Sequence, residues 1–307
     1  MICRHFVSIF RSTSRTGCGT TPFSIIGVDF LLTRYEDANC GIMLKVARKC
    51  YLPMNALLLK LIRKYDGRFK VSFSISGTAL DQFEAYAPEV IQSFRELVAT
   101  GCVELLSETY NHSLAFLYSP EEFREQVALH DERIEALFGV TPRVFRNTEL
   151  IYNNDLARAV EAMGYKAVLA EGADHVLGWR SPNFVYRPAG CDRLKLLLKN
   201  YRLSDDIAFR FSNHQWPEFP LTADKFSEWA HAANASGDLI NLFMDYETFG
   251  EHQWESTGIF AFMEALPEVM LRTPVSRSSR LRKRRPGSSR WRASTCRISC
   301  RGRTPSA

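Results

Sequence analysis

The chain has 307 residues, of which 46% are hydrophobic, so it is long and apolar enough for one large domain with its own core. The net charge of +5 is unevenly spread: residues 272–307 hold 12 Lys and Arg and no acid, residues 1–34 carry +3, and −10 is left for residues 35–271. The acidic body argues against a nucleic-acid-binding domain, and no apolar run reaches the roughly 18 residues of a membrane span.

The predicted elements begin with an alternating pattern at 70–76, "KVSFSIS", which is typical of a strand. A helical pattern follows over 79–99, with a break expected at Pro88. "CVELLS" at 102–107 predicts the next strand.

Ser119 and Glu122 then form a capping box, and Pro120 occupies the first position of the helix behind them. This helix is expected to end at Gly139, and "RVFRN" at 143–147 predicts a strand.

A further helix is expected to begin at a cap formed by Asn154 or Asp155 and to end at Gly164. The region from 172 to about 222 looks less regular. The other expected elements are a strand at 166–171, a helix near 223–234, a strand at 238–244 and a helix over 258–270.

Strands that alternate with helices predict an α/β fold, with a parallel sheet and helical crossovers. Because the run contains no Gly-rich phosphate loop, a barrel is favoured over a dinucleotide-binding fold. In such barrels the functional groups lie at the C-terminal ends of the strands.

Polar residues follow three of the predicted strands. The clusters are Glu104, Glu108 and His112; Arg146, Asn147 and Glu149; and Asp245, Glu247 and His252. Each residue alone is more often a cap, an ion-pair partner or a structural histidine, but three clusters at one rim are hard to attribute to chance. Two carboxylates held about 5–5.5 Å apart perform glycoside hydrolysis with retention, one as nucleophile and one as acid/base.

The segments around these clusters resemble glycoside hydrolase family 57, especially its bacterial α-amylase-like members. The resemblance covers about residues 35–271. It rests on "GCVELLSETYNHSLA" (101–115), "FRNTELIY" (145–152), "LSDDIAFRFS" (203–212) and "LFMDYETFGEHQW" (242–254).

The resemblance implies an incomplete (β/α)7 barrel and a retaining enzyme of the α-amylase or 4-α-glucanotransferase type. By position, Glu149 matches the nucleophile and Asp245 the acid/base. The residues expected at the sugar site are His112, Arg146, Asp206, Glu108, Glu247, His252 and Trp254. The expected partner is an α-1,4-glucan or maltooligosaccharide, with no metal, cofactor, specific nucleic acid or membrane.

The chain departs from the family pattern at its first strand, where a His-Gln-Pro motif is missing; "HQWP" at 214–217 is in the wrong place to replace it. Residues 13–18, "TSRTGC", can be coded so that the frame one base earlier reads His-Gln-Pro-Tyr-Arg-Leu. In the same way, the codons of residues 273–285, read one base away, permit the sequence "DPRFEFVTPSEAA". We therefore interpret 1–34 as an aberrant out-of-frame segment and 35–271 as the catalytic barrel.

The remaining 272–307 are interpreted as a basic, disordered out-of-frame tail. The barrel is then expected to lack an intact first strand and the C-terminal helical region. Sequencing of the gene tests this hypothesis, since DNA that does not encode these strings one base away contradicts it.

Three alternatives stay open. The chain could be an inactive, damaged family member with at most weak glucan binding, or the tail could be a nucleic-acid-binding arm. A metal-dependent polysaccharide deacetylase is the third, although no HxxxH pair occurs in the body. Eight scattered cysteines without a CxxC pair predict reduced thiols and a cytoplasmic location.

Overall fold

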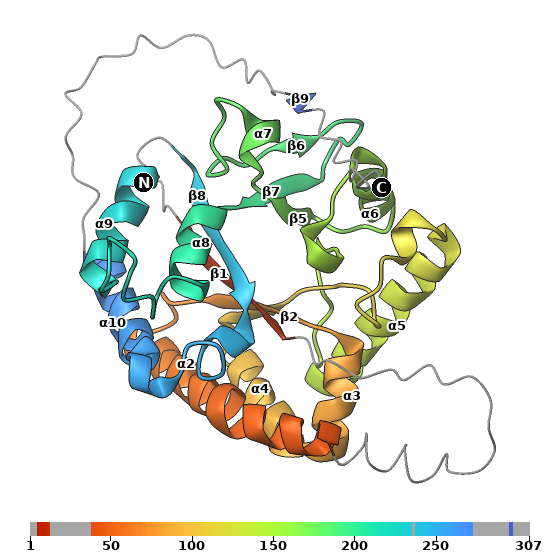
Figure 1. The fold of residues 1–307 in the computed structure, drawn as a ribbon. Coiled ribbons are helices and arrows are strands. Elements are labelled where there is room, and N and C mark those ends of the chain that lie inside the picture. Colours follow the sequence, from red (N-terminus) through yellow and green to blue (C-terminus); the bar gives the residue numbers. More distant parts are fainter. Residues whose placement is uncertain (1–4, 13–37, 235–236, 273–294, 297–307) are drawn as a thin grey trace, which may run out of the picture.

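The computed structural model describes residues 5–12, 38–234, 237–272 and 295–296 (Figure 1). A seven-stranded, all-parallel sheet forms its centre, with the strand order β3-β2-β1-β8-β7-β5-β4. The strands are β1 (His5–Ser12), β2 (Val71–Ile75), β3 (Val103–Leu105), β4 (Val144–Arg146), β5 (Ala167–Glu171), β7 (Lys195–Lys199) and β8 (Leu239–Asp245).

The two edge strands of this sheet, β3 and β4, meet directly beyond the end of β3. The Ser107 amide donates to the Val144 carbonyl at 2.9 Å, and the Arg146 amide donates to the Ser107 carbonyl at 2.8 Å. The strands therefore follow one another in chain order around a ring, as a (β/α)7 barrel requires. Because all of them are parallel, their carboxyl ends share one rim.

Helices surround the sheet (Figure 1). They are α2 (Leu52–Lys64), α3 (Gly77–Tyr86), α4 (Pro88–Ala99), α5 (Pro120–Phe138), α6 (Asn154–Ala162), α7 (Asp174–Leu177), α8 (Tyr201–Ala208), α9 (Ala223–Ala233) and α10 (Ile259–Arg272). Residues 38–46 are also helical and run into a π-helical turn, η1 (Ala47–Tyr51), just before α2.

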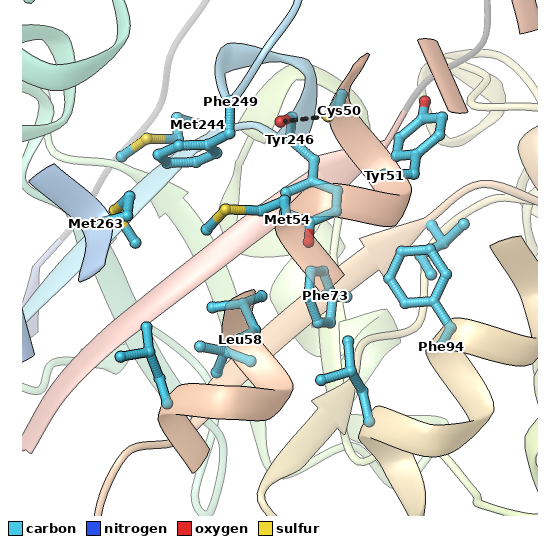
Figure 2. Packing of buried hydrophobic residues seen from close by; sticks show 14 of the residues in the cluster. Cys50, Tyr51, Met54, Leu58, Phe73, Phe94, Met244, Tyr246, Phe249 and Met263 are labelled. Atoms are coloured by element: carbon cyan, nitrogen blue, oxygen red, sulfur yellow. Dashed lines mark hydrogen bonds between the residues drawn. The ribbon is translucent and has the colours of Figure 1, made fainter. Parts of the chain in front are cut away.

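The two faces of β2 have different environments. Val71, Phe73 and Ile75 belong to the main hydrophobic core, in which Phe73 packs edge-on against Phe94 of α4 (Figure 2). The serines between them face the barrel interior, where Ser74 contacts Glu108, the residue that follows β3. Because side chains alternate along a strand, the pattern "VSFSIS" gives an apolar outer face and a polar inner face.

Several local predictions are confirmed. The chain breaks between α3 and α4 at Ala87 and Pro88, and the Ser119 hydroxyl accepts from the amide of Glu122 at the start of α5. Gly139 ends α5 in the left-handed conformation, with φ of 69°. The prediction for α6 was wrong by one residue, since the Asn153 side chain, which accepts from the Leu156 amide, is the cap.

The expectation of a missing first strand is wrong. β1 lies in the middle of the sheet, with His5–Arg11 in register beside Leu239–Asp245 of β8 and Ser8–Ser12 beside Val71–Ile75 of β2. The segment "HFVSIF" consists mainly of β-branched and aromatic residues, which favour strands whatever the reading frame.

The interpretation of 172–222 as irregular is also wrong in part, since it contains the barrel strand β7 and helix α8. The strand sequence "KLLLK" has no β-branched residue and is too short for its periodicity to separate a strand from a helix.

Most of the two basic ends lies outside the described residues, including 13–34 with the expected His-Gln-Pro coding region, and 273–294 and 297–307 of the tail. The exceptions are β1 and a two-residue strand, β9 (Thr295–Cys296), which pairs with β6 (Arg187–Pro188). Among the described helices, none combines the length and the hydropathy that a bilayer crossing demands.

Candidate active site

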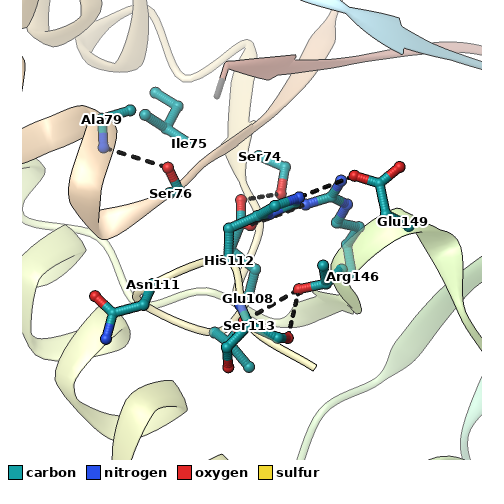
Figure 3. A network of polar contacts seen from close by, with 12 residues as sticks. Ser74, Ile75, Ser76, Ala79, Glu108, Asn111, His112, Ser113, Arg146 and Glu149 are labelled. Atoms are coloured by element: carbon teal, nitrogen blue, oxygen red, sulfur yellow. Dashed lines mark hydrogen bonds and ion pairs between the residues drawn. The ribbon is translucent and has the colours of Figure 1, made fainter. Parts of the chain in front are cut away.

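Groups from the three clusters that the sequence singled out lie at the carboxyl ends of three barrel strands. Glu108 and His112 follow β3, Glu149 follows β4, and Asp245 is the last residue of β8. Figure 3 shows Glu108, His112, Arg146 and Glu149 in one network of polar contacts.

Glu108 is the buried anion of this network. Its side chain has 0% exposure, and its Oε1 accepts from the Ser74 hydroxyl at 2.7 Å. Its Oε2 accepts from Nη1 of Arg146 at 2.8 Å and lies 3.0 Å from Nδ1 of His112. Arg146 is equally buried and stacks over the Phe243 ring. Such burial favours a supporting role for Glu108 and Arg146 over direct contact with a sugar.

Burial by itself would raise the pKa of Glu108. The Arg146 guanidinium and the hydrogen bond with His112 oppose that effect, with smaller contributions from the charges of His130 and His112, and together they lower the pKa to about 2. The Glu108 carboxylate is therefore ionised in the folded protein near neutral pH.

This shift predicts a loss of stability in acid. The ordinary pKa of the glutamate is 4.5. A carboxylate with a lower pKa in the folded state stabilises the fold above that value, and the contribution disappears as the pH falls toward 2. This lowering of the Glu108 pKa on folding corresponds to on the order of 3 kcal/mol of unfolding free energy. Urea unfolding at a series of pH values measures this contribution. The difference in unfolding free energy between wild type and Glu108→Gln should become smaller below pH 4.5. A difference that does not change with pH would contradict the assignment.

His112 connects the buried anion to an exposed one. Its Nε2 lies 3.1 Å from Oε1 of Glu149, whose side chain is 58% exposed, whereas the His112 side chain is 18% exposed. Arg146 also approaches the ring, with Nη1 3.2 Å from Nδ1. Glu149 is thus accessible to a ligand while one of its oxygens stays in contact with a fixed nitrogen.

The backbone is strained at both ends of this contact. His112, Glu149 and Leu150 have φ of 52°, 53° and 54°, the left-handed region that non-glycine residues rarely adopt. Asp66 is the other such residue in the described part of the chain. Each left-handed residue costs about 1–2 kcal/mol, and such strain persists where the surroundings enforce it, often at functional sites.

Hydrogen bonds join the two strained loops. The Thr148 hydroxyl donates to the Ser113 carbonyl at 2.7 Å and lies 3.2 Å from the Thr109 hydroxyl, which also accepts from the Ser113 amide. Leu150 anchors the second loop, because its buried side chain joins Leu106 and Phe243 in the small apolar cluster inside the barrel.

The loop after β8 is held from the helical side. The Cys50 thiol contacts the Tyr246 carbonyl at 3.1 Å (Figure 2). The Tyr51 hydroxyl donates to Glu247 at 2.5 Å. Both contacts come from the π-helical turn η1. Glu247 is only 8% exposed, so its carboxylate is directed to Tyr51 in the protein interior, whereas the sequence placed it at the sugar site.

Gly250 of this loop predicts a local stability effect. Its φ is 114°, and a Cβ at this position would overlap the Lys49 carbonyl oxygen. Gly250→Ala is expected to lower the unfolding free energy by about 1–3 kcal/mol in urea denaturation. Gly139→Ala is the matched control, because Gly139 also has positive φ but open space around it, so an equal loss in both variants would rule out the steric overlap.

Three further residues that the sequence predicted for the sugar site lie on other segments, in α8 and after β8. Asp206 of α8 accepts from Arg210 at 2.6 Å, and its pKa is raised by burial against the opposing effect of that guanidinium. His252 is exposed, and Trp254 is 63% exposed beside a surface hollow of about 710 Å³. The structure describes no contact between these three and the network around Glu108.

Sequence reasoning missed two residues that hold the site, Ser74 and Tyr51. The alternation in "VSFSIS" is a signal for Ser74, because it marks one face of a central strand as polar. No pattern in the sequence identifies Tyr51, whose partner is 196 positions away.

The chain is similar in sequence to known proteins. The family model described as glycosyl hydrolase family 57 matches residues 26–281. A Methanocaldococcus jannaschii protein named "Putative alpha-amylase" is 49% identical over 240 residues, which are 77% of this chain and 50% of that protein. The chain therefore spans about half the length of this curated relative.

Two solved structures are similar in fold. The 4-α-glucanotransferase from Thermococcus litoralis matches with a TM-score of 0.63 and 15% identity, over 86% of this chain and 38% of that one. The family 57-type branching enzyme from Pyrococcus horikoshii matches with a TM-score of 0.61 and 12% identity, over 86% and 68%. With the family model covering most of the chain and a relative 49% identical, the chain belongs to glycosyl hydrolase family 57.

Proposed function

We propose that the chain carries the catalytic barrel of a retaining enzyme that acts on α-1,4-glucans or maltooligosaccharides. The observation that carries the proposal is the environment of Glu149: an exposed carboxylate at the carboxyl end of a barrel strand, with a histidine on one oxygen and strained backbone beneath it. Asp245 ends another strand at the same rim, so the fold supplies two carboxyl groups from separate strands.

In the first step an oxygen of Glu149 attacks the anomeric carbon of the bound glucan. The bond from that carbon to the bridging oxygen breaks with its electron pair on the oxygen, and protonated Asp245 gives its proton to that oxygen. The products are a glycosyl ester on Glu149, a shortened glucan with a free hydroxyl, and an ionised Asp245.

In the second step Asp245 takes a proton from water or from a sugar hydroxyl, whose oxygen attacks the same anomeric carbon. The ester bond breaks, Glu149 regains its negative charge, and the double inversion leaves an α-linked or α-configured product. Water as acceptor gives hydrolysis, and a sugar hydroxyl gives transfer.

The test is incubation of the purified chain with maltoheptaose, followed by proton NMR of the first product anomer and by chromatography of chain lengths. Early release of α-anomers supports the proposal, and products longer than the substrate identify transfer. Initial release of β-anomers would exclude retention. No turnover by the wild-type chain would favour the alternative of an inactive family member, in which case binding of maltoheptaose by calorimetry measures what remains.

A further inference from the structure

We propose that His112 and Glu108 are positioning residues for Glu149: Glu108 orients the His112 ring, and the doubly protonated ring donates from Nε2 to the Glu149 carboxylate. The inference rests on the proposed role of Glu149 as nucleophile. It assigns to Glu108 and His112 a different task from the sugar contacts that the sequence resemblance implied.

Glu108 has the contacts of an anchor. It is fully buried, so a ligand does not reach it, and it receives hydrogen bonds from Ser74 on β2 and Arg146 on β4. These two donors come from strands on opposite sides of the residue. They fix the carboxylate with little freedom to move.

The ring of His112 has both nitrogens close to carboxylate oxygens, 3.0 Å from Glu108 at Nδ1 and 3.1 Å from Glu149 at Nε2. A neutral ring carries one N–H and would leave one carboxylate oxygen facing a lone pair. A ring protonated on both nitrogens donates to both. Because the positive charge is then adjacent to Glu149, it favours the ionised form that attacks the sugar.

Arg146 is the other charged group that faces the ring, and its positive charge opposes that of the protonated ring. Arg146 lies 3.2 Å from Nδ1, but its Nη1 is closer to Glu108, at 2.8 Å, and donates there. His130 of α5 also influences Glu108, while its own Nε2 lies 2.8 Å from the Ile75 carbonyl. The two carboxylates that contact the ring, Glu108 and Glu149, offset the positive charges of Arg146 and His112.

The two strained loops hold His112 and Glu149 next to each other. His112 and Glu149 both have left-handed backbone, and the hydrogen bonds through Thr148 and Ser113 hold their loops together. An exposed carboxylate can adopt several rotamers, and a contact with a fixed side chain restricts them. His112 supplies one such contact to Glu149.

The kinetic test compares His112→Gln with wild type on maltoheptaose. We expect kcat to fall about 100-fold, the cost of misplacing a reacting group by about 1 Å, with little change in KM. The acidic limb of the kcat/KM profile, which reports ionisation of the nucleophile, should move to higher pH, because a nearby positive charge is lost. Two control variants remote from the rim, His231→Gln on α9 and Glu135→Gln on α5, should change neither kcat nor the pH profile. A large rise in KM with kcat unchanged would overturn the proposal in favour of a sugar contact.

A second measurement does not depend on activity. In protein labelled with ¹⁵N-histidine, the His112 signals, assigned by their absence in His112→Gln, should show both ring nitrogens protonated at neutral pH. Glu149→Gln should shift the Nε2 signal, and Glu108→Gln should shift the Nδ1 signal. A singly protonated ring, or an Nε2 signal indifferent to Glu149→Gln, would overturn the proposal even in an active enzyme. Conversely, absence of turnover by the wild type would reject the proposed function while the ring signals still decide this inference.

Discussion

Replacement of Glu149 by Gln is expected to lower the rate of maltoheptaose cleavage by on the order of 10⁴-fold, as loss of a covalent nucleophile does in other enzymes. The amide keeps the size of the side chain but has no anionic oxygen to attack the anomeric carbon. Because the side chain is 58% exposed and its ion pair with His112 lies at the surface, the fold should be little affected. Reducing-sugar release and thermal unfolding measure the two effects.

The exposed Glu135→Gln on α5 is the matched control for this variant, since it makes the same chemical change away from the barrel rim. Azide provides a stricter test with Glu149→Ala. A small anion that enters the vacated space should attack the anomeric carbon directly and give a β-glycosyl azide. Equal activity of wild type and Glu149→Gln would reject the assignment of the nucleophile.

Arg146→Met is expected to lower the unfolding free energy by about 3–5 kcal/mol, because it leaves the Glu108 carboxylate charged inside the barrel without its guanidinium partner. Both side chains have 0% exposure, so water does not replace the lost contact. Urea denaturation at pH 7 measures the loss. At a pH near 3 the penalty should be smaller, because Glu108 in the variant then takes up a proton.

The double variant Arg146→Met with Glu108→Gln separates this electrostatic effect from simple loss of packing. If the unpaired charge is the cause, the double variant should recover a large part of the stability lost in Arg146→Met. A double variant as unstable as the sum of the two single variants would show that the pair does not interact energetically.

Much of the barrel follows from local sequence. The strand at 70–76, the helix break at Pro88 and the capping of α5 by Ser119 depend on residues within a few positions of one another. The sequence likewise identifies Glu149 and Asp245 as groups at strand ends, because polar residues that follow apolar strands are recognisable without knowledge of the partners.

The partners themselves were decided by the tertiary structure. β1 could not be placed from the sequence, since its position depends on pairing with β8, whose residues lie more than 200 positions later. Glu108 looked like a sugar ligand in the sequence, but ring closure between β3 and β4 encloses it with Arg146, 38 positions away. Strand and helix patterns depend on neighbouring residues, whereas the charge, burial and orientation of a site depend on which distant strands meet. The sequence by itself therefore determined most of the strands and helices and which acids follow a strand, and the closed ring decided which acid is buried and which is exposed.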